Sequence, residues 1–356
     1  MKSMPMPVNR IWSYWKIMNE RQRMNIILSV DYEVFMGRNT GTVENTLLIP
    51  SQALCDVATR YGIPLVFFVD VGFLLRLREE GRRFPRLMLD HDRVIRHLER
   101  IVEGGHELQL HVHPHWEDSC WNGESWSIDT RRYQLHDFDA VEIGEIVRRY
   151  TDALRTIAGD DGVFTYRAGG WMIQPFHLIR KALLDSGIYI DSTVFAGGTS
   201  GGDVRQFDFS NAPTASHWFF DNDPLLMNPD GEFLEVPIAS YQLSPAFFWR
   251  FAIAKKLGGA KHRSLGDGCP IRINNADILT KLSRRTNSVV SMDGYKASFL
   301  EGAFRRYQLD GKTDFVVMGH PKALSRYSLQ KLECFIAGRN ASEFVGYEAY
   351  RSLLTS

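Results

Sequence analysis

The sequence predicts an α/β protein whose strands form a closed or nearly closed (β/α) barrel. Short β-branched runs alternate along the chain with longer amphipathic stretches, and glycines mark the turns between them. The length of 356 residues is sufficient for such a barrel, which takes roughly 250 residues as one unit. The number and length of the expected strands favour a barrel over an open sheet.

The expected elements follow one another in strand–helix order. We expect strands over residues 26–31, 64–69, 107–111, 163–167, 188–191 and 315–319. We expect helices over residues 49–61, 92–103, 140–158 and 174–186. In a (β/α) barrel the catalytic groups gather where the parallel strands end, so the polar residues that follow each strand are the candidates for a site.

Two parts of the chain depart from this order. Residues 1–23 set Trp12 and Trp15 among Met, Pro and charged residues without a clear period. We expect an N-terminal extension there, either because Met24 is the true translation start or because a helix is appended. Residues 24–356 are expected to form a single catalytic barrel with an insertion at 240–300.

The insertion holds a basic and aromatic stretch. Between residues 245 and 265 there is no acid, and the cationic side chains are Arg250, Lys255, Lys256, Lys261 and Arg263. The favoured interpretation is a solvated helix that packs an aromatic face on the barrel, and the alternative is peripheral contact with a membrane or a lipid-linked substrate. Residues 289–293 could form one more strand.

Composition excludes several classes of protein. Lys and Arg number 42, as do Asp and Glu, so the formal net charge is zero; a nucleic-acid-coating protein needs a surplus of cations. The four cysteines never form a CxxC pair, which excludes a disulfide framework and a thiolate zinc site and favours a reducing compartment. We expect a cytoplasmic protein without a signal peptide or transmembrane segment.

The richest polar cluster is the His-rich end of the strand over residues 107–111. His111 and His115 share one face if the chain turns helical there, whereas an extended backbone would turn His111, His113 and His115 the same way. Imidazoles at a strand end are suited to a zinc-like ion with an open position for water. The alternative is a merely polar loop or a His-lined core.

A second pair of polar residues closes the first strand. Side chains at i and i+2 of a strand project to one face, so Asp31 and Glu33 can address one site together. One carboxylate can bind metal while the other takes a proton from water. Taken alone, acids at a strand end are also common helix caps.

Five motifs in order resemble the NodB-type polysaccharide deacetylases, which are metal-dependent carbohydrate esterases and N-deacetylases with a distorted (β/α) barrel. The resemblance spans most of the chain, and no single motif is as specific as the ordered set. The motifs are Asp31-Tyr32-Glu33, HxxxH from His111 to His115, Thr165 to Trp171, Tyr189 to Phe195, and Gly319-His320-Pro321.

The resemblance implies a metal site, with Zn²⁺ as the expected ion. His111, His115 and an acid of the first motif would bind it. The family has two adjacent Asp, the first a base and the second a ligand, whereas here Tyr32 takes the second position. We therefore expect Asp31 as the general base and Glu33 as the ligand, and the reverse division stays open.

The resemblance also implies the remaining roles. Arg167 would pair with the base, His320 would be the general acid and Asp191 would orient it. Substrate would be held by the Gly170 N–H and by His113, Trp116 and Trp171. The alternatives are a rim ion pair for Arg167, a simple turn for the glycines, a structural His320 and core positions for the tryptophans.

These implications give an expected function. The protein would remove an N-acetyl group from a nucleotide- or lipid-linked sugar or a glycan intermediate, in surface-polysaccharide biosynthesis. One alternative is a metal-dependent amidase acting on a non-sugar C–N bond. The other is a catalytically silent barrel that binds a glycan or a metal, which the altered first motif supports.

Overall fold

The computed structural model describes residues 23–37, 39–202, 206–270 and 275–354. The main sheet is built from β1 (Asn25–Tyr32), β2 (Val66–Asp70), β3 (Glu107–Val112), β6 (Thr165–Ala168), β7 (Ile190–Asp191), β10 (Trp218–Phe220), β11 (Phe233–Glu235) and β14 (Asp314–Val317). Its order is β10-β11-β7-β6-β3-β2-β1-β14. All neighbours are parallel except β10 and β11.

The two sides of this sheet are joined by the chain that follows β11. The Ile238 N–H donates to the Val194 carbonyl beyond β7 at 2.8 Å, and the Ala239 N–H donates to the Val316 carbonyl of β14 at 2.9 Å. The sheet therefore curls round on itself, and the predicted distorted (β/α) barrel is confirmed.

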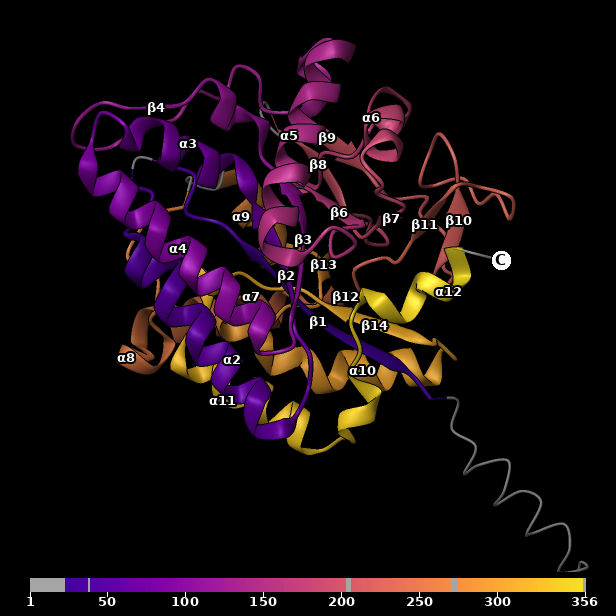
Figure 1. Cartoon of the computed structure of the whole chain (residues 1–356). Coiled ribbons are helices and arrows are strands. Elements are labelled where there is room, and N and C mark those ends of the chain that lie inside the picture. The colour runs from indigo at the N-terminus through magenta and orange to yellow at the C-terminus, as the bar shows by residue number, and fades with distance from the viewer. Residues whose placement is uncertain (1–22, 38, 203–205, 271–274, 355–356) are drawn as a thin grey trace, which may run out of the picture.

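Helices cover the outside of the barrel (Figure 1). They are α2 (Ile49–Tyr61), α3 (Val71–Gly81), α4 (Pro85–Glu103), α5 (Ala140–Ala158), α6 (Arg180–Asp185), α10 (Leu300–Leu309), α11 (Arg326–Ala337) and α12 (Arg351–Leu354). Three small antiparallel pairs of strands lie outside the main sheet in the described part of the chain: β4 (Cys120–Trp121) with β5 (Trp126–Ser127), β8 (Thr199–Gly201) with β9 (Gln206–Asp208), and β12 (Ser240–Leu243) with β13 (Thr286–Val289). Within the described residues, no helix has the length and apolarity to cross a membrane.

The strands present two different faces because side chains alternate along them. One face packs against the helices in the large core. The other encloses a smaller apolar cluster that includes Ile27, Phe68 and Val316, with Tyr347 and Tyr350 packed at the end where β1 and β14 begin. The opposite end, where the strands finish, is left for polar side chains.

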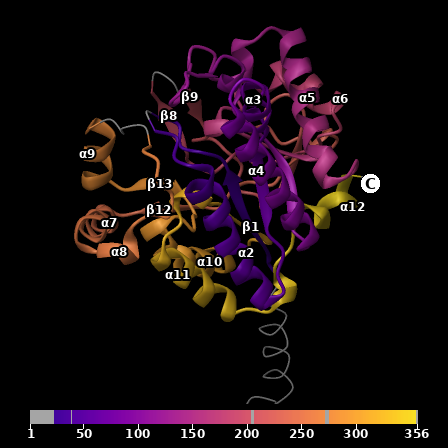
Figure 2. The ribbon, with the colours of Figure 1, turned by 60° about the vertical axis from the view of Figure 1, so that its left-hand side comes forward.

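The predicted insertion is a ribbon with helices between its strands. The antiparallel pair β12 and β13 brackets α7 (Pro245–Leu257), α8 (Gly259–His262) and α9 (Asn275–Ser283). Figure 2 shows these helices as a group beside the barrel, on the side away from α5 and α6. The chain then returns to β14, where the Met292 N–H donates to the Met318 carbonyl at 2.9 Å.

Some of the expected helices are observed with the expected bounds, and one is shorter. The expected helices at 49–61 and 140–158 are confirmed as α2 and α5. The helix expected over 174–186 is shortened to α6 (Arg180–Asp185), and a separate 3-10 turn over Phe176–Leu178 precedes it. Residues 1–22, where an extension is expected, lie outside the described residues.

Candidate active site

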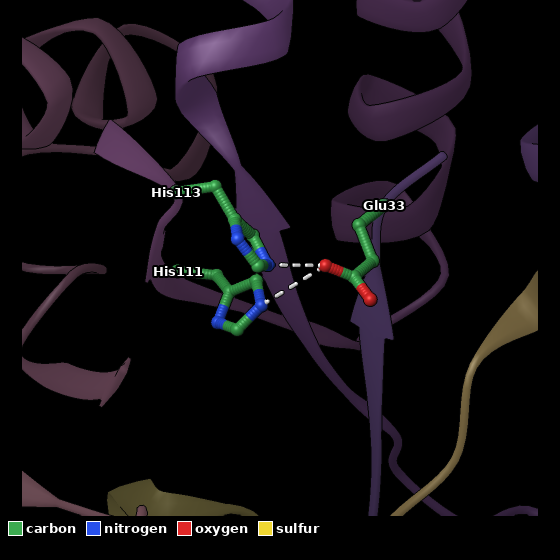
Figure 3. A group of neighbouring side chains, drawn as sticks. All are labelled: Glu33, His111 and His113. Atoms are coloured by element: carbon green, nitrogen blue, oxygen red, sulfur yellow. Dashed lines mark ion pairs between the residues drawn. The ribbon is translucent and has the colours of Figure 1, made fainter. Parts of the chain in front are cut away.

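Three potential metal donors converge where β1 and β3 end (Figure 3). The Oε2 of Glu33 lies 2.5 Å from the Nε2 of His113 and 3.4 Å from the Nε2 of His111. These donor atoms lie within 4.8 Å of one another. The cluster belongs to the inner face of the barrel, which also carries the buried polar residues described below.

The backbone of the His-rich segment explains which histidines meet. His111 lies in β3, and His113 keeps an extended backbone with φ −112° and ψ 91°, so the two side chains share the inner face. Pro114 then begins a short 3-10 turn that redirects the chain. His115 is buried beside this cluster, with its ring stacked on Tyr133 and 5.3 Å from that of His113, and it is not one of the three converging donors.

Asp31 is buried beneath the cluster and is paired with Arg167. The Nη1 of Arg167 lies 2.8 Å from Oδ1 of Asp31. The second oxygen, Oδ2, faces the Nε2 of His111 at 4.0 Å and the Nε2 of His320 at 3.8 Å. Burial alone would raise the pKa of Asp31, but Arg167 and the two histidines hold it below its ordinary value.

Arg167 is fully buried, with 0% of its side chain exposed. It projects from β6 and donates from Nε to the Ser192 carbonyl at 2.8 Å and from Nη2 to the Ser29 and Ser192 hydroxyls. Its guanidinium also lies 3.9 Å above the ring of Phe68. These contacts fix the fork of donors in one orientation, so Arg167 is an interior ion pair and not a rim contact.

Besides the two histidines, Glu33 has a lysine partner that the sequence did not predict. Lys322 donates to Oε1 of Glu33 at 2.8 Å and to the Val34 carbonyl at 2.6 Å. Burial would raise the pKa of Glu33, but Lys322 and His113 lower it well below its ordinary value. Glu33 is therefore an ionised carboxylate whose Oε2 points at the histidines.

His320 follows β14 and is oriented by Asp293. Its Nδ1 lies 2.8 Å from Oδ2 of Asp293, whose other oxygen accepts the His320 backbone N–H at 2.8 Å. The Nε2 then faces Oε1 of Glu33 at 3.5 Å. Burial would lower the pKa of His320, but Asp293 together with Asp31 raises it.

The expectation that Asp191 orients His320 needs correction. Ser192 points to the barrel interior, where it binds Arg167 and Tyr347, so the alternation of β7 turns Asp191 to the outer face. There Asp191 accepts from Thr193 at 2.6 Å and lies in register with Glu235 of β11. Asp293 takes the place expected for it, and its only sequence signal is that an acid ends the segment 289–293.

The glycine-rich turn after β6 fits closely around His113. A Cβ added to Gly169 would lie 2.6 Å from the Nδ1 of His113, so only glycine leaves room for that ring. Gly170 and Trp171 both have positive φ, at 62° and 64°. A positive φ is unusual for tryptophan, and such conformations concentrate at functional sites.

The two tryptophans expected to stack on sugar differ in position. Trp171 is half-buried and packs against Phe195 and Phe207. Trp116 is in the core, where its Nε1 donates to Asp70 at 2.7 Å and Phe73 packs against its ring. Trp116 is thus a core residue in this structure, because the 3-10 turn after Pro114 directs it between α3 and the β4–β5 hairpin.

The donor set fits a divalent metal ion. The Nδ1 of His111 lies 2.8 Å from the Arg167 carbonyl, so that nitrogen donates to the backbone, and Nε2 is directed at Glu33 and would be the atom that binds a metal ion. Two imidazoles and one carboxylate are a ligand set of catalytic zinc sites, which keep one position open. Glu33, His111 and His113 could therefore hold a metal ion.

Comparison with solved structures identifies the fold. A presumed polysaccharide deacetylase from Mycobacterium smegmatis superposes with a TM-score of 0.50 at 14% identity, over 94% of this chain and 91% of that one. An allantoinase gives 0.44 at 12% identity, over 90% of this chain and 85% of that one. A family 4 carbohydrate esterase from Streptomyces lividans gives 0.25 at 11% identity, over 48% and 62%. No family model and no curated protein sequence matches.

Proposed function

We propose that this protein is a metal-dependent hydrolase that removes an N-acetyl group from a sugar or glycan intermediate. Its distorted barrel, which is the fold of the NodB-type deacetylases, supports this proposal. The observation that carries the proposal is the convergence of Glu33, His111, His113, Asp31 and His320 at one end of the barrel. Residues that could bind a metal ion, a buried carboxylate paired with arginine and a histidine of raised pKa are groups that metal-dependent amide hydrolysis uses.

The metal ligands that we propose are Glu33, His111 and His113, with Zn²⁺ as the expected ion. His113 replaces His115 of the sequence-based assignment because its Nε2 faces Oε2 of Glu33 at 2.5 Å. A bound divalent ion would polarise the acyl carbonyl and make a water molecule more acidic. His111 keeps its orientation through the Arg167 carbonyl, as ligating histidines commonly do through a backbone acceptor.

Asp31 is the proposed general base. Arg167 occupies Oδ1 and keeps the group ionised, while Oδ2 remains directed toward the histidines and would take the proton of the attacking water. Glu33 is less suited to this role because both of its oxygens already have cationic or imidazole partners. This division matches the sequence-based expectation for the two acids.

His320 is the proposed general acid. As an imidazolium held by Asp293, it can give its Nε2 proton to the departing amine. The N–H of Gly170 is the proposed donor to the tetrahedral oxyanion, because the positive φ of this residue turns the backbone sharply beside His113. Trp171 would line the sugar, and Asp191 has no proposed part in the reaction.

The biological setting is also a proposal. We infer a role in surface-polysaccharide biosynthesis, with a nucleotide- or lipid-linked N-acetyl sugar as substrate. All four cysteines, Cys55, Cys120, Cys269 and Cys334, are free, and three of them are exposed, which supports a reducing, cytoplasmic compartment.

The test is acetate release from a panel of free, nucleotide-linked and lipid-linked N-acetyl sugars, with metal content measured on the same samples. Asp31→Asn should keep the metal and lose at least about 100-fold in turnover, since a general base contributes 10² to 10⁴. The matched control is Asp185→Asn, in an exposed pair with Lys181. Full activity of Asp31→Asn would refute the base assignment.

Two outcomes would favour the other functions. Amide hydrolysis without preference for sugars would favour the amidase. Metal binding without hydrolysis of any substrate would favour a silent glycan-binding barrel.

A further inference from the structure

The insertion has an excess of cationic over acidic residues. Residues 245–285 include nine Lys and Arg against two Asp, whereas the whole chain is balanced at 42 of each sign. Among the residues that the structure describes, no ion pair involves Arg250, Lys255 or Lys256. The charges of these three side chains are therefore not neutralised by an acid within the described part of the chain.

Helix α7 has an apolar line that its own packing does not use. Its buried side, with Phe247 and Phe248, contacts Tyr295 and Phe299, so the aromatic face expected from the sequence is already satisfied. Trp249, Ile253 and Leu257 recur every four residues, and they are 55%, 56% and 76% exposed. Three large side chains at this spacing lie along one side of a helix.

Cationic side chains flank this line. A helix turns by about 100° per residue, so Arg250 and Lys256 lie about 60° to either side of Ile253. Long cationic side chains can bend away from an apolar layer while their stems stay in it. Helix α9 adds exposed Ile278 and Leu279 nearby, since its Leu282 carbonyl accepts the Nε1–H of Trp249 at 3.2 Å.

We propose that this surface, formed by Trp249, Arg250, Ile253, Lys256 and Leu257 of α7 with Ile278 and Leu279 of α9, docks on an anionic lipid bilayer. Tryptophan and aliphatic side chains exposed beside Lys and Arg are the kinds of side chain that interfacial helices present to a membrane. Anionic headgroups would neutralise the net positive charge of the insertion. A second copy of this chain would instead bring two cationic surfaces together.

The docking surface is tied to the rim of the proposed site. Beyond α8, Ser264 bridges Ser325, and the Gly266 N–H donates to the Lys322 carbonyl at 3.1 Å. Lys322 is the residue that holds Glu33. Docking would therefore keep the site close to the bilayer surface, where a lipid-linked sugar would be found; this last step rests on the proposed function.

The test is sedimentation of the full chain with vesicles of phosphatidylcholine alone and of phosphatidylcholine mixed equally with phosphatidylglycerol. We expect binding only to the anionic vesicles, with a decrease as salt is raised. Ile253→Ser with Leu257→Ser should abolish detectable binding. Arg250→Glu with Lys256→Glu should weaken it by at least about 25-fold, at roughly fivefold for each charge removed.

Matched controls come from the opposite side of the barrel in Figure 2. Val141→Ser replaces a 71% exposed apolar residue of α5, and Lys181→Glu reverses an exposed charge of α6. Both should bind like the unaltered protein, and circular dichroism should show that all variants are folded. Equal binding to the two vesicle types, or none, would overturn the proposal, as would an oligomer that the α7 variants dissociate.

The outcome is independent of catalysis. Asp31→Asn should bind anionic vesicles like the unaltered protein, so that failure of the proposed hydrolase and failure of the docking surface can be distinguished. Retained vesicle binding by the Ile253→Ser and Leu257→Ser double variant would also contradict the assignment to α7.

Discussion

Two pairs of buried acids lie on opposite faces of the same barrel, and they are in opposite states. On the inner face, Asp31 and Glu33 are surrounded by Arg167, Lys322 and histidines, and their pKa values are lowered. On the outer face, burial raises the pKa of Asp191 and raises that of Glu235 well above its ordinary value. Glu235 there also lies beside Asp191, whose charge opposes ionisation.

Both pairs are buried, so burial does not explain the difference between them. The cationic side chains around the inner pair lower its pKa values, and this distinguishes the candidate site from the structural pair. The inner pair is kept ionised and can bind cations or take protons. The outer pair, whose pKa values are raised, connects strand ends, with Thr193 donating to Asp191 and the Val194 N–H donating to Glu235. Removing a cation from the inner pair should therefore have a far larger effect than neutralising the outer pair.

The largest effect is expected from Arg167→Met. It would leave Asp31 buried without its partner, so we expect a loss of about 3–5 kcal/mol in the free energy of unfolding, measured by urea titration, together with loss of activity. Arg167→Lys keeps the charge and should lose less. Unfolding of Arg167→Met at the unaltered urea midpoint would mean that Asp31 does not depend on this pair.

The next effect concerns the proposed metal ligands. His113→Ala should weaken zinc binding by more than about 100-fold, because even the outer partners of ligands are worth 10- to 100-fold, and His115→Ala should weaken it far less. Calorimetric titration of zinc into the metal-free variants measures both. Weaker binding by His115→Ala than by His113→Ala would restore the sequence-based ligand set.

A smaller effect is expected from Asp293→Asn. Asp293 raises the pKa of His320, so the substitution should lower it, and the imidazolium would be lost at a lower pH. We expect kcat to fall about tenfold or more and its alkaline limb to move to lower pH. An unmoved alkaline limb would show that His320 is not the group that the profile reports.

The smallest effect is expected from Glu235→Gln. The glutamine resembles the protonated acid, so stability near neutral pH should change by about 1 kcal/mol or less. The raised pKa means that the folded state holds the proton longer than the unfolded state, so this group's contribution to stability declines as pH rises from its unfolded value toward its folded one. Thermal melts across this range should show a flatter decline in the variant, and an identical slope would contradict the assignment.

The sequence predicted the features that depend on local periodicity. Strand alternation correctly predicted that Asp31 and Glu33 would face the same region, and it allowed His113 to join His111. It could not decide between His113 and His115, because that depends on where the backbone stops being extended. Pro114 ends the extended segment one residue before His115.

The features that the sequence did not predict depend on contacts between distant segments. Lys322 and Glu33 are 289 residues apart in the sequence. Asp293 and His320 are 27 residues apart, and they meet because the chain returns to the barrel through β14. The role predicted for Asp191 was wrong because consecutive side chains of a strand point to opposite faces, and Asp191 faces outward next to the inward-facing Ser192. Asp293, which lies within the insertion, supplies the carboxylate that contacts His320.

The hydroxyl of Tyr347 donates to the Ser192 hydroxyl at 2.6 Å, and Ser192 in turn accepts from Arg167, the partner of Asp31. The surroundings of the proposed base therefore depend both on β1 and on Tyr347, which follows the last strand of the main sheet. During translation, the hydrogen-bond chain behind Asp31 cannot be completed until Tyr347 has left the ribosome. A nascent chain arrested before that point would hold the inner acids without this support, which links the appearance of the site to the synthesis of the segment around Tyr347.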